Sequence, residues 1–198
     1  MHRHIGLFSG TFDPIHQGHL AFAAEARRVC GLDEVLFMPE RRPRGKHGVT
    51  DIAHRIALIE RATKTEAAFR VLSLAADQFT VKNTLPELRS LLGKADLTLL
   101  IGSDVVRTFS YRWEGLDTLF KEVSFAVGMR ADDNPAEITE LLAGLEREYG
   151  TKIRYTAINT PEAGMASSQI RSNSASAARL HPDTIAYIQE HGLYLNPA

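Results

Sequence analysis

The chain has 198 residues with a formal net charge of −1, and its 44% hydrophobic and 24% charged residues are typical of a globular protein. We expect no nucleic-acid partner, because no cluster of Lys and Arg dominates, and no membrane segment, because no apolar run is long enough to span a bilayer. The single cysteine, Cys30, cannot form an internal disulfide, so a reducing, cytoplasmic location is expected.

Apolar runs alternate with helical patterns along the chain. Strands are predicted at 5–8, 35–38, 69–72, 97–101, 123–127 and 152–155. Helices are predicted at 20–26, 51–62, 82–92, 135–148, 168–179 and 183–191. This alternation predicts an α/β fold with a doubly wound, mostly parallel sheet. We expect one domain over residues 1–198, with a helical C-terminal part over about 166–198.

The junction between the first strand and the first helix carries the run GTFDPIHQGH at residues 10–19. The free N–H groups and the dipole of a helix N-terminus favour an anion such as phosphate. His16 and His19 are three residues apart, so both imidazoles can reach one ligand. Gly10 and Gly18 allow the backbone to approach that ligand closely. Two surface histidines beside a turn are the alternative, which the length and the place of the run make the weaker interpretation.

This run resembles the HxGH signature of the nucleotidylyltransferase superfamily in its extended form GTFDPxHxGH, and most closely that of the bacterial nicotinate-mononucleotide adenylyltransferases (the NadD family). The resemblance implies a Rossmann-like nucleotidylyltransferase fold and an enzyme of NAD biosynthesis. Such an enzyme transfers the adenylyl group of ATP to nicotinate mononucleotide, giving deamido-NAD and pyrophosphate. His16 and His19 would then contact the ATP phosphates as catalytic residues, with Gly10, Thr11, Phe12 and Gly18 around ATP. Mg²⁺ would accompany ATP, without a dedicated set of protein ligands.

A second segment, MASSQIR at 165–171, resembles the family's C-terminal ISSTxIR signature. The resemblance implies that Ser167 and Ser168 bind ATP phosphates and that Arg171 is catalytic. Ala166 replaces the first serine, so one hydroxyl is lost. Taken alone, the segment is more typical of a serine N-cap followed by a solvated arginine.

A third segment, IGSD at 101–104, follows a buried-strand pattern and resembles the family's IIGAD segment. The resemblance implies that Gly102 and Asp104 bind ATP, Asp104 through hydroxyls of the adenosine ribose. A carboxylate at such a turn is a paired acceptor suited to a ribose, and it can also cap the following helix. Residues 183–194 resemble the family's closing helix and LY ending, which indicates membership rather than chemistry.

The segments expected to bind the acceptor match the family less well. FTVKNTL at 79–85 resembles the YTIDTL segment, which implies that Thr84 helps to bind the nicotinate nucleotide, although the segment is one residue longer and begins with Phe79. Trp113 lies where the family has a tryptophan that stacks on the pyridine ring, although a lone tryptophan is more often packing. RRPRGKH at 41–47 replaces the PPHK loop and displaces Lys46, so it either clamps phosphate or is a solvated basic loop.

The sequence leaves three functions open. The first is the nicotinate-mononucleotide adenylyltransferase, with ATP and a pyridine mononucleotide as partners. The second is a related nucleotidylyltransferase that uses nicotinamide mononucleotide or a phosphopantetheine or sugar phosphate. The third, a non-catalytic nucleotide-binding module, is disfavoured by the presence of the motif residues. We expect preference for the acid mononucleotide through backbone N–H groups near residues 80–84. Homo-oligomerisation is left open.

Overall fold

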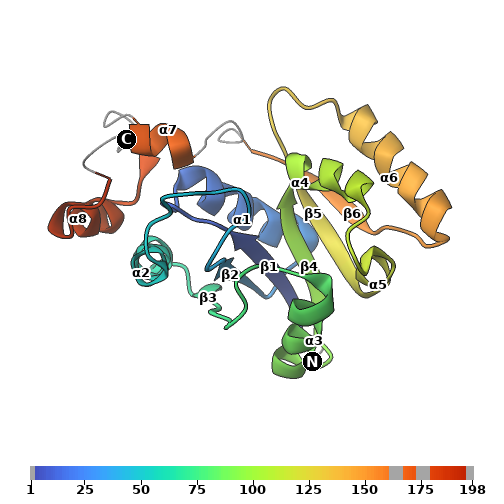
Figure 1. The fold of residues 1–198 in the computed structure, drawn as a ribbon, viewed down its shortest axis with the longest axis horizontal. Coiled ribbons are helices and arrows are strands. Elements are labelled where there is room, and N and C mark those ends of the chain that lie inside the picture. The colour runs from blue at the N-terminus through green and yellow to red at the C-terminus, as the bar shows by residue number, and fades with distance from the viewer. Residues whose placement is uncertain (1–2, 161–166, 173–178, 195–198) are drawn as a thin grey trace.

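The computed structural model describes residues 3–160, 167–172 and 179–194 (Figure 1). The strands are β1 (His4–Gly10), β2 (Glu34–Pro39), β3 (Phe69–Val71), β4 (Asp96–Gly102), β5 (Val123–Met129) and β6 (Tyr155–Asn159). The helices are α1 (Gln17–Cys30), α2 (Ile52–Thr63), α3 (Val81–Leu92), α4 (Ser103–Arg107), α5 (Leu116–Glu122), α6 (Pro135–Tyr149), α7 (Ser167–Ser172) and α8 (Pro182–Glu190), and η1 (Thr108–Tyr111) is a 3-10 helix.

The strands form one six-stranded sheet in the order β3-β2-β1-β4-β5-β6, and every pair is parallel. The predicted doubly wound, parallel α/β fold is therefore confirmed. The strand order reverses direction at β1, where Leu7 lies opposite Leu36 of β2 and Leu99 of β4. Sheets of this type bind ligands outside the carboxyl ends of the strands, next to this reversal. The loop after β1 and the turn between β4 and α4 lie at that place.

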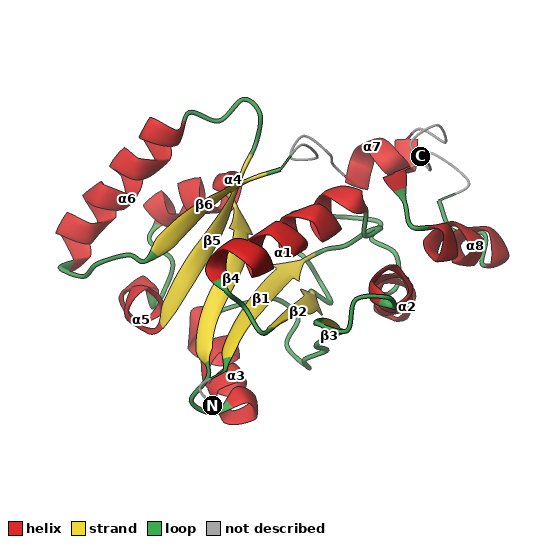
Figure 2. Cartoon of the chain, turned by 180° about the vertical axis from the view of Figure 1, so that it is seen from behind, coloured by secondary structure: helices red, strands yellow, loops and turns green. Residues whose placement is uncertain are grey.

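Helices cover both faces of the sheet. Figures 1 and 2 show α1 against one face, behind the sheet in the first view and in front of it in the second. Apolar side chains of α1, α2 and α8 pack on this face, whereas those of α3, α4, α5 and α6 pack on the opposite face. Successive residues of β1 divide between the two, with Leu7 in one core and Phe8 in the other. In the described part of the chain, no helix is long and apolar enough to cross a membrane.

Two differences from the predicted elements concern the second half of the chain. The strand predicted at 152–155 is wrong, because the last strand runs from Tyr155 to Asn159. Ile153 is buried, but its N–H donates to the side chain of Glu146 at 2.8 Å, so this apolar residue packs before the strand begins. The short helices α4 and α5 were not predicted. α7 covers the beginning of the helix predicted at 168–179, whereas residues 173–178 and Ala166 lie outside the described residues.

Candidate active site

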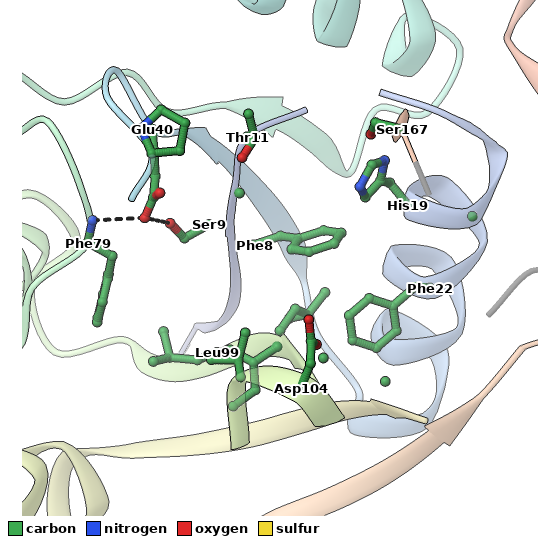
Figure 3. A pocket seen from close by; sticks show the side chains of 18 of the residues that line it. Phe8, Ser9, Thr11, His19, Phe22, Glu40, Phe79, Leu99, Asp104 and Ser167 are labelled. Atoms are coloured by element: carbon green, nitrogen blue, oxygen red, sulfur yellow. Dashed lines mark hydrogen bonds between the residues drawn. The ribbon is translucent and has the colours of Figure 1, made fainter. Parts of the chain in front are cut away.

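A cavity of about 750 Å³ opens at the carboxyl ends of β1 and β4 (Figure 3). Segments from distant parts of the sequence surround it: the loop after β1, the loop after β2, the turn before α4, and α7. Twelve of the predicted site residues line it: Gly10, Thr11, His16, Gly18, His19, Lys46, Gly102, Asp104, Trp113, Ser167, Ser168 and Arg171. The structure therefore brings the three sequence motifs to one place.

Phe12 and Thr84 are the two predicted site residues that do not line the cavity. The ring of Phe12 is buried against Phe8 and Phe37, with ring centroids 5.2 and 5.7 Å away, and its backbone has a positive φ of 50°. This φ is uncommon for a residue other than glycine, so ring burial holds the loop in its shape. Thr84 is fully buried, and its hydroxyl accepts the N–H of Thr80 at 2.9 Å.

His16 and His19 form a stacked pair at the start of α1, with ring centroids 3.7 Å apart. His16 is the N-cap residue, and its backbone N–H donates to Nδ1 of His19 at 3.2 Å. A neutral imidazole that accepts at Nδ1 carries its proton on Nε2, so His19 is a donor at Nε2. Nδ1 of His16 is buried without a hydrogen-bond partner among the described residues.

Burial keeps both imidazoles neutral at neutral pH. It lowers the pKa of His16 from 6.5 to about 4. Burial also holds the pKa of His19 well below its ordinary value, and the neighbouring His16 and Lys46 lower it further. An anion bound beside these rings would favour their charged forms. The pair can therefore act as neutral donors before a ligand arrives and can take up positive character beside a phosphate.

Asp13 anchors the loop between β1 and α1. Its carboxylate is 2% exposed and accepts the phenol O–H of Tyr194 at 2.7 Å and the N–H of Thr50 at 3.3 Å. Burial, and then the bond to this carboxylate, raise the pKa of Tyr194, so the phenol remains a donor. The LY ending, interpreted from the sequence as structural, thus makes direct contact with the motif at the other end of the chain.

Two side chains of α7 donate hydrogen bonds to backbone carbonyl groups of the same loop. Ser167 Oγ donates to the carbonyl of Pro14 at 3.0 Å, and Arg171 Nη1 donates to the carbonyl of Asp13 at 2.5 Å. The Arg171 guanidinium also lies 3.9 Å from the Asp13 carboxylate, and its side chain is 40% exposed at the cavity. A guanidinium has five N–H donors, so Arg171 can hold this loop and still offer donors to a ligand.

Arg55 of α2 is a site residue that the sequence analysis missed. It is 1% exposed, and its guanidinium donates to the carbonyl groups of Thr11 at 2.7 Å, Thr50 at 2.8 Å and Arg41 at 3.3 Å. It therefore ties the first loop to both ends of the loop between β2 and α2. The sequence signal is its place on the apolar face of α2, four residues before Ile59, where a solvated arginine is not expected.

The basic loop at 41–47 contributes two of its long cations to the cavity, Arg44 and Lys46. Lys46 Nζ donates to Oγ1 of Thr11 at 2.9 Å, while Arg44 donates to the side chain of Gln78. Arg41 instead donates to the carbonyl of Leu74 at 3.0 Å. The arginines and the lysine of this loop are exposed, and two of them also line the cavity, so both interpretations of the loop stay open.

The turn between β4 and α4 places Asp104 on the cavity wall. Its carboxylate accepts from Arg130 Nη2 at 3.0 Å, and both side chains are about half exposed. A Cβ at residue 102 would collide with Oδ1 of Asp104, so any side chain here would require this half-exposed carboxylate to move. Arg130, at the end of β5, is a second residue that the sequence analysis missed.

Aromatic rings and one carboxylate form the remaining part of the wall. Trp113 packs edge-on against Phe109, with ring centroids 5.1 Å apart, and Phe79 lies at the cavity before α3. Oε1 of Glu40 accepts the backbone N–H of Phe79 at 3.1 Å and the hydroxyl of Ser9 at 3.3 Å (Figure 3). We call the wall made by Glu40, Phe79, Phe109 and Trp113 the aromatic wall. No sequence motif pointed to Glu40.

A parallel sheet of this order, with a cavity outside the carboxyl ends of its central strands, is typical of the nucleotide-binding α/β proteins. A family model described as cytidylyltransferase-like matches residues 7–173. The chain is 34% identical over 201 residues to a probable nicotinate-nucleotide adenylyltransferase of Neisseria meningitidis, covering 96% of this chain and 98% of that protein. It belongs to the nicotinate-nucleotide adenylyltransferase family within the cytidylyltransferase-like proteins, as the sequence motifs predicted.

Other relatives and solved structures agree with this assignment. A probable nicotinate-nucleotide adenylyltransferase of Listeria monocytogenes is 31% identical over 204 residues, with 98% of each chain covered. A Plasmodium falciparum nicotinic acid mononucleotide adenylyltransferase complexed with NaAD has a TM-score of 0.78 at 20% identity, again with 98% of each chain covered. The same protein complexed with APC has a TM-score of 0.74 at 21% identity. At these identities, the solved structures show the shared fold.

Proposed function

We propose that this enzyme transfers the adenylyl group of ATP to nicotinate mononucleotide, giving deamido-NAD and pyrophosphate in NAD biosynthesis. The observation that carries the proposal is the stacked pair of buried His16 and partly buried His19 at the N-terminus of α1, facing the cavity beside Arg171. Its near full-length similarity to relatives named for this activity supports the choice of acceptor.

The reaction needs no strong base and no covalent intermediate. An oxygen of the mononucleotide phosphate forms a bond to the α-phosphorus of ATP, and the bond from that phosphorus to the oxygen bridging the α- and β-phosphates breaks. Both electrons of the broken bond leave with pyrophosphate. A phosphate monoester is already anionic near neutral pH, so catalysis consists of positioning and of stabilising charge on the phosphates.

The phosphate groups would be held by the first loop and by α7. His16 and His19 would donate to the phosphates around the reacting phosphorus, where the N–H groups of the first turn of α1 also favour an anion. Arg171 and Ser168 would bind the β- and γ-phosphates that leave as pyrophosphate. Lys46, which donates to Thr11 in the loop after β1, would add a further cation to this phosphate site.

The nucleosides would lie on either side of this phosphate site. Asp104 would accept hydrogen bonds from the adenosine ribose hydroxyls, next to Gly102. On the acceptor side, the pyridine ring would stack on Trp113. Thr84 is buried, so any contribution it makes to acceptor binding passes through the start of α3.

Mg²⁺ would enter as part of the MgATP substrate, bound to phosphate oxygens and water, and would neutralise phosphate charge during transfer. Asp13, a carboxylate of the loop between β1 and α1, fits poorly as a direct metal ligand because it already accepts hydrogen bonds from Tyr194 and Thr50. Among the described residues, no group of three or more His, Cys, Asp or Glu side chains is arranged to hold a metal ion.

The test is an acceptor panel with MgATP, in which pyrophosphate release and the dinucleotide product are both measured. The panel contains nicotinate mononucleotide, nicotinamide mononucleotide, phosphopantetheine and sugar phosphates. We expect the highest kcat/KM with nicotinate mononucleotide. A higher kcat/KM with any other acceptor would replace the proposed substrate with that acceptor. Absence of pyrophosphate release with all of them would overturn the activity.

A further inference from the structure

Three of the backbone N–H groups near residues 80–84, which are expected to bind the acceptor's carboxylate, already have partners within the protein. At the start of α3, the N–H of Thr80 donates to the Thr84 hydroxyl at 2.9 Å, and that of Asn83 donates to the Thr80 hydroxyl at 3.3 Å. The N–H of Thr84 donates to the carbonyl of Thr80 at 2.9 Å. These bonds form the N-cap of α3. The N–H of Phe79 differs, because its partner is the side chain of Glu40 from another segment.

Glu40 follows directly after β2, and its own N–H donates to the carbonyl of Gly10 at 2.9 Å. Its carboxylate lies at the cavity, half-buried, between the hydroxyl of Ser9 and the N–H of Phe79. In Figure 3, Glu40 and Phe79 lie on one side of Phe8, whereas His19 lies on the other. The carboxylate therefore belongs to the part of the cavity away from the histidine pair.

The arginines that follow Glu40 in the sequence are held by other groups. Arg41 donates to the carbonyl of Leu74, and Arg44 donates to Gln78. The buried guanidinium of Arg55 interacts electrostatically with Glu40 but donates its hydrogen bonds to backbone carbonyl groups.

Glu40 thus presents a carboxylate at the aromatic wall, where it accepts a backbone N–H as a bound carboxylate would. The N-cap bonds of α3 join neighbouring residues and belong to the helix itself. The bond from the Phe79 N–H to Glu40 joins separate segments at the cavity, so a ligand carboxylate can take the place of Glu40 without breaking the helix cap.

We propose that Glu40 determines how strongly the enzyme discriminates between the acid and amide forms of the pyridine mononucleotide. This inference rests on the proposed function. An acid acceptor that uses the Phe79 N–H must displace Glu40 and then lies beside a second negative charge. An amide acceptor can instead donate its NH₂ group to the Glu40 carboxylate, which leaves the bond to Phe79 in place. Glu40 therefore lowers the preference for the acid form, without reversing it.

The alternative is that Glu40 only ties the segment before α3 to β1. The two roles predict different kinetics. Loss of a structural tie would lower kcat/KM for both acceptors in parallel and would raise the KM for ATP. Loss of a specificity determinant changes the ratio of the two kcat/KM values and leaves the KM for ATP unchanged.

The test compares Glu40→Gln with Glu60→Gln. Glutamine at position 40 keeps an acceptor oxygen for the Phe79 N–H and removes the charge. Glu60 is exposed on α2 and does not line the cavity, so its variant has the same change in net charge. We measure kcat/KM for both mononucleotides, the KM for ATP and the melting temperature. We expect the acid-to-amide ratio to rise about fivefold in Glu40→Gln, the effect of removing one partly solvated like charge. The ratio should stay unchanged in Glu60→Gln.

A second variant, Glu40→Ala, removes both the charge and the acceptor oxygen, and its ratio should rise as well even if both constants fall. An unchanged or lower ratio in both Glu40 variants overturns the inference, as does a parallel loss for the two acceptors. The proposed function is judged separately on the wild-type enzyme, by the formation of deamido-NAD. A wild-type enzyme that forms deamido-NAD, with an unchanged ratio in both variants, would overturn the role of Glu40 and leave the proposed function standing.

Discussion

The imidazole of His19 is held in a defined orientation before any ligand arrives. Its Nδ1 accepts the N–H of His16, its ring stacks on that of His16, and burial keeps it neutral. A donor fixed in this way needs little reorganisation when charge develops on a phosphate, which is the condition for efficient electrostatic stabilisation. Burial also lowers the pKa of the neighbouring His16, which makes the free energy of unfolding depend on pH.

We expect His19→Ala to lower kcat about a hundred- to a thousandfold, the usual loss when one preorganised donor is removed. His19→Gln should recover part of the rate because the glutamine amide keeps an N–H donor. Steady-state kinetics and thermal melting of both variants check this. Wild-type turnover in a folded His19→Ala enzyme would remove His19 from the mechanism.

His16 makes the protein less stable in acid. In the unfolded chain its imidazole binds a proton as the pH falls through 6.5, whereas in the folded protein it does so only near pH 4. The unfolded state therefore binds more protons across this window, and the free energy of unfolding falls as the pH falls, by about 3 kcal/mol for this group. In His16→Gln this part of the pH dependence should be absent. Urea denaturation from neutral pH to about pH 4 measures it, and equal slopes in variant and wild type would contradict the assignment.

At the scale of secondary-structure elements, α2 acts as the support for two loops. Its buried residue Arg55 supplies the donors for three carbonyl groups in the loops around the cavity. Loops have few hydrogen bonds of their own. A single long donor side chain on a rigid helix can therefore fix two loops in place.

Replacing this support should affect stability and nucleotide binding together. Arg55→Met keeps a long side chain but leaves the carbonyl groups of Thr11, Thr50 and Arg41 without their donor, so we expect a loss of about 3 kcal/mol and a higher KM for ATP. Arg61→Met on the same helix is the control, because Arg61 lies over the ring of Tyr187 at 4.1 Å and does not contact these loops. Equal destabilisation of the two variants would argue that Arg55 is ordinary packing.

The elements that could be predicted from the sequence are those with long periodic or continuous apolar patterns. The central strands and α2, α3 and α6 belong to this group, since burial on one or both faces shapes their sequences. The short helices α4 and α5 have too few turns for a period, and the edge strand β6 has one fully buried residue, Ile158, so Ile153 misled the prediction. Tertiary packing, rather than a local sequence pattern, defines α4, α5 and β6.

The site residues also fall into two groups, those that a local sequence motif reveals and those that it does not. His16, His19 and Arg171 lie in contiguous motifs, so neighbouring residues suffice to find them. Arg55 and Glu40 act through backbone groups that lie 44 and 39 positions away, at Thr11 and Phe79, and such contacts leave no local pattern in a single sequence. Only the placement of an arginine on an apolar helix face gave a hint.

Over the whole molecule, residues from both ends of the sequence meet at one loop. Tyr194 donates to the Asp13 carboxylate across 181 positions, and Arg171 donates to the carbonyl of the same residue across 158. Tyr187 of α8 packs in the same core as α1 and α2. The position of the closing segment therefore affects the geometry of the phosphate loop.

We expect Tyr194→Phe to cost about 2 kcal/mol of stability, because the buried carboxylate of Asp13 loses a donor. The KM for ATP should rise more than the KM for the acceptor, since Asp13 belongs to the loop beside the histidine pair. Tyr149→Phe, in a tyrosine of α6 outside the cavity lining, is the control and should leave both constants unchanged. An identical KM for ATP in Tyr194→Phe would show that the loop holds its shape without the phenol.

The contact between Tyr194 and Asp13 has a consequence for how the protein is made. The ribosome produces the GTFDPIHQGH segment early, long before the phenol that holds its aspartate, and domains fold progressively from the N-terminus during synthesis. A chain that contains α2 but has not yet reached Arg171 thus carries the histidines and Arg55, but it lacks the contacts of Arg171 and Tyr194 with this loop. Translation products that stop before Tyr194 should bind ATP less well, because the loop between β1 and α1 gains this contact only after the tyrosine has been added.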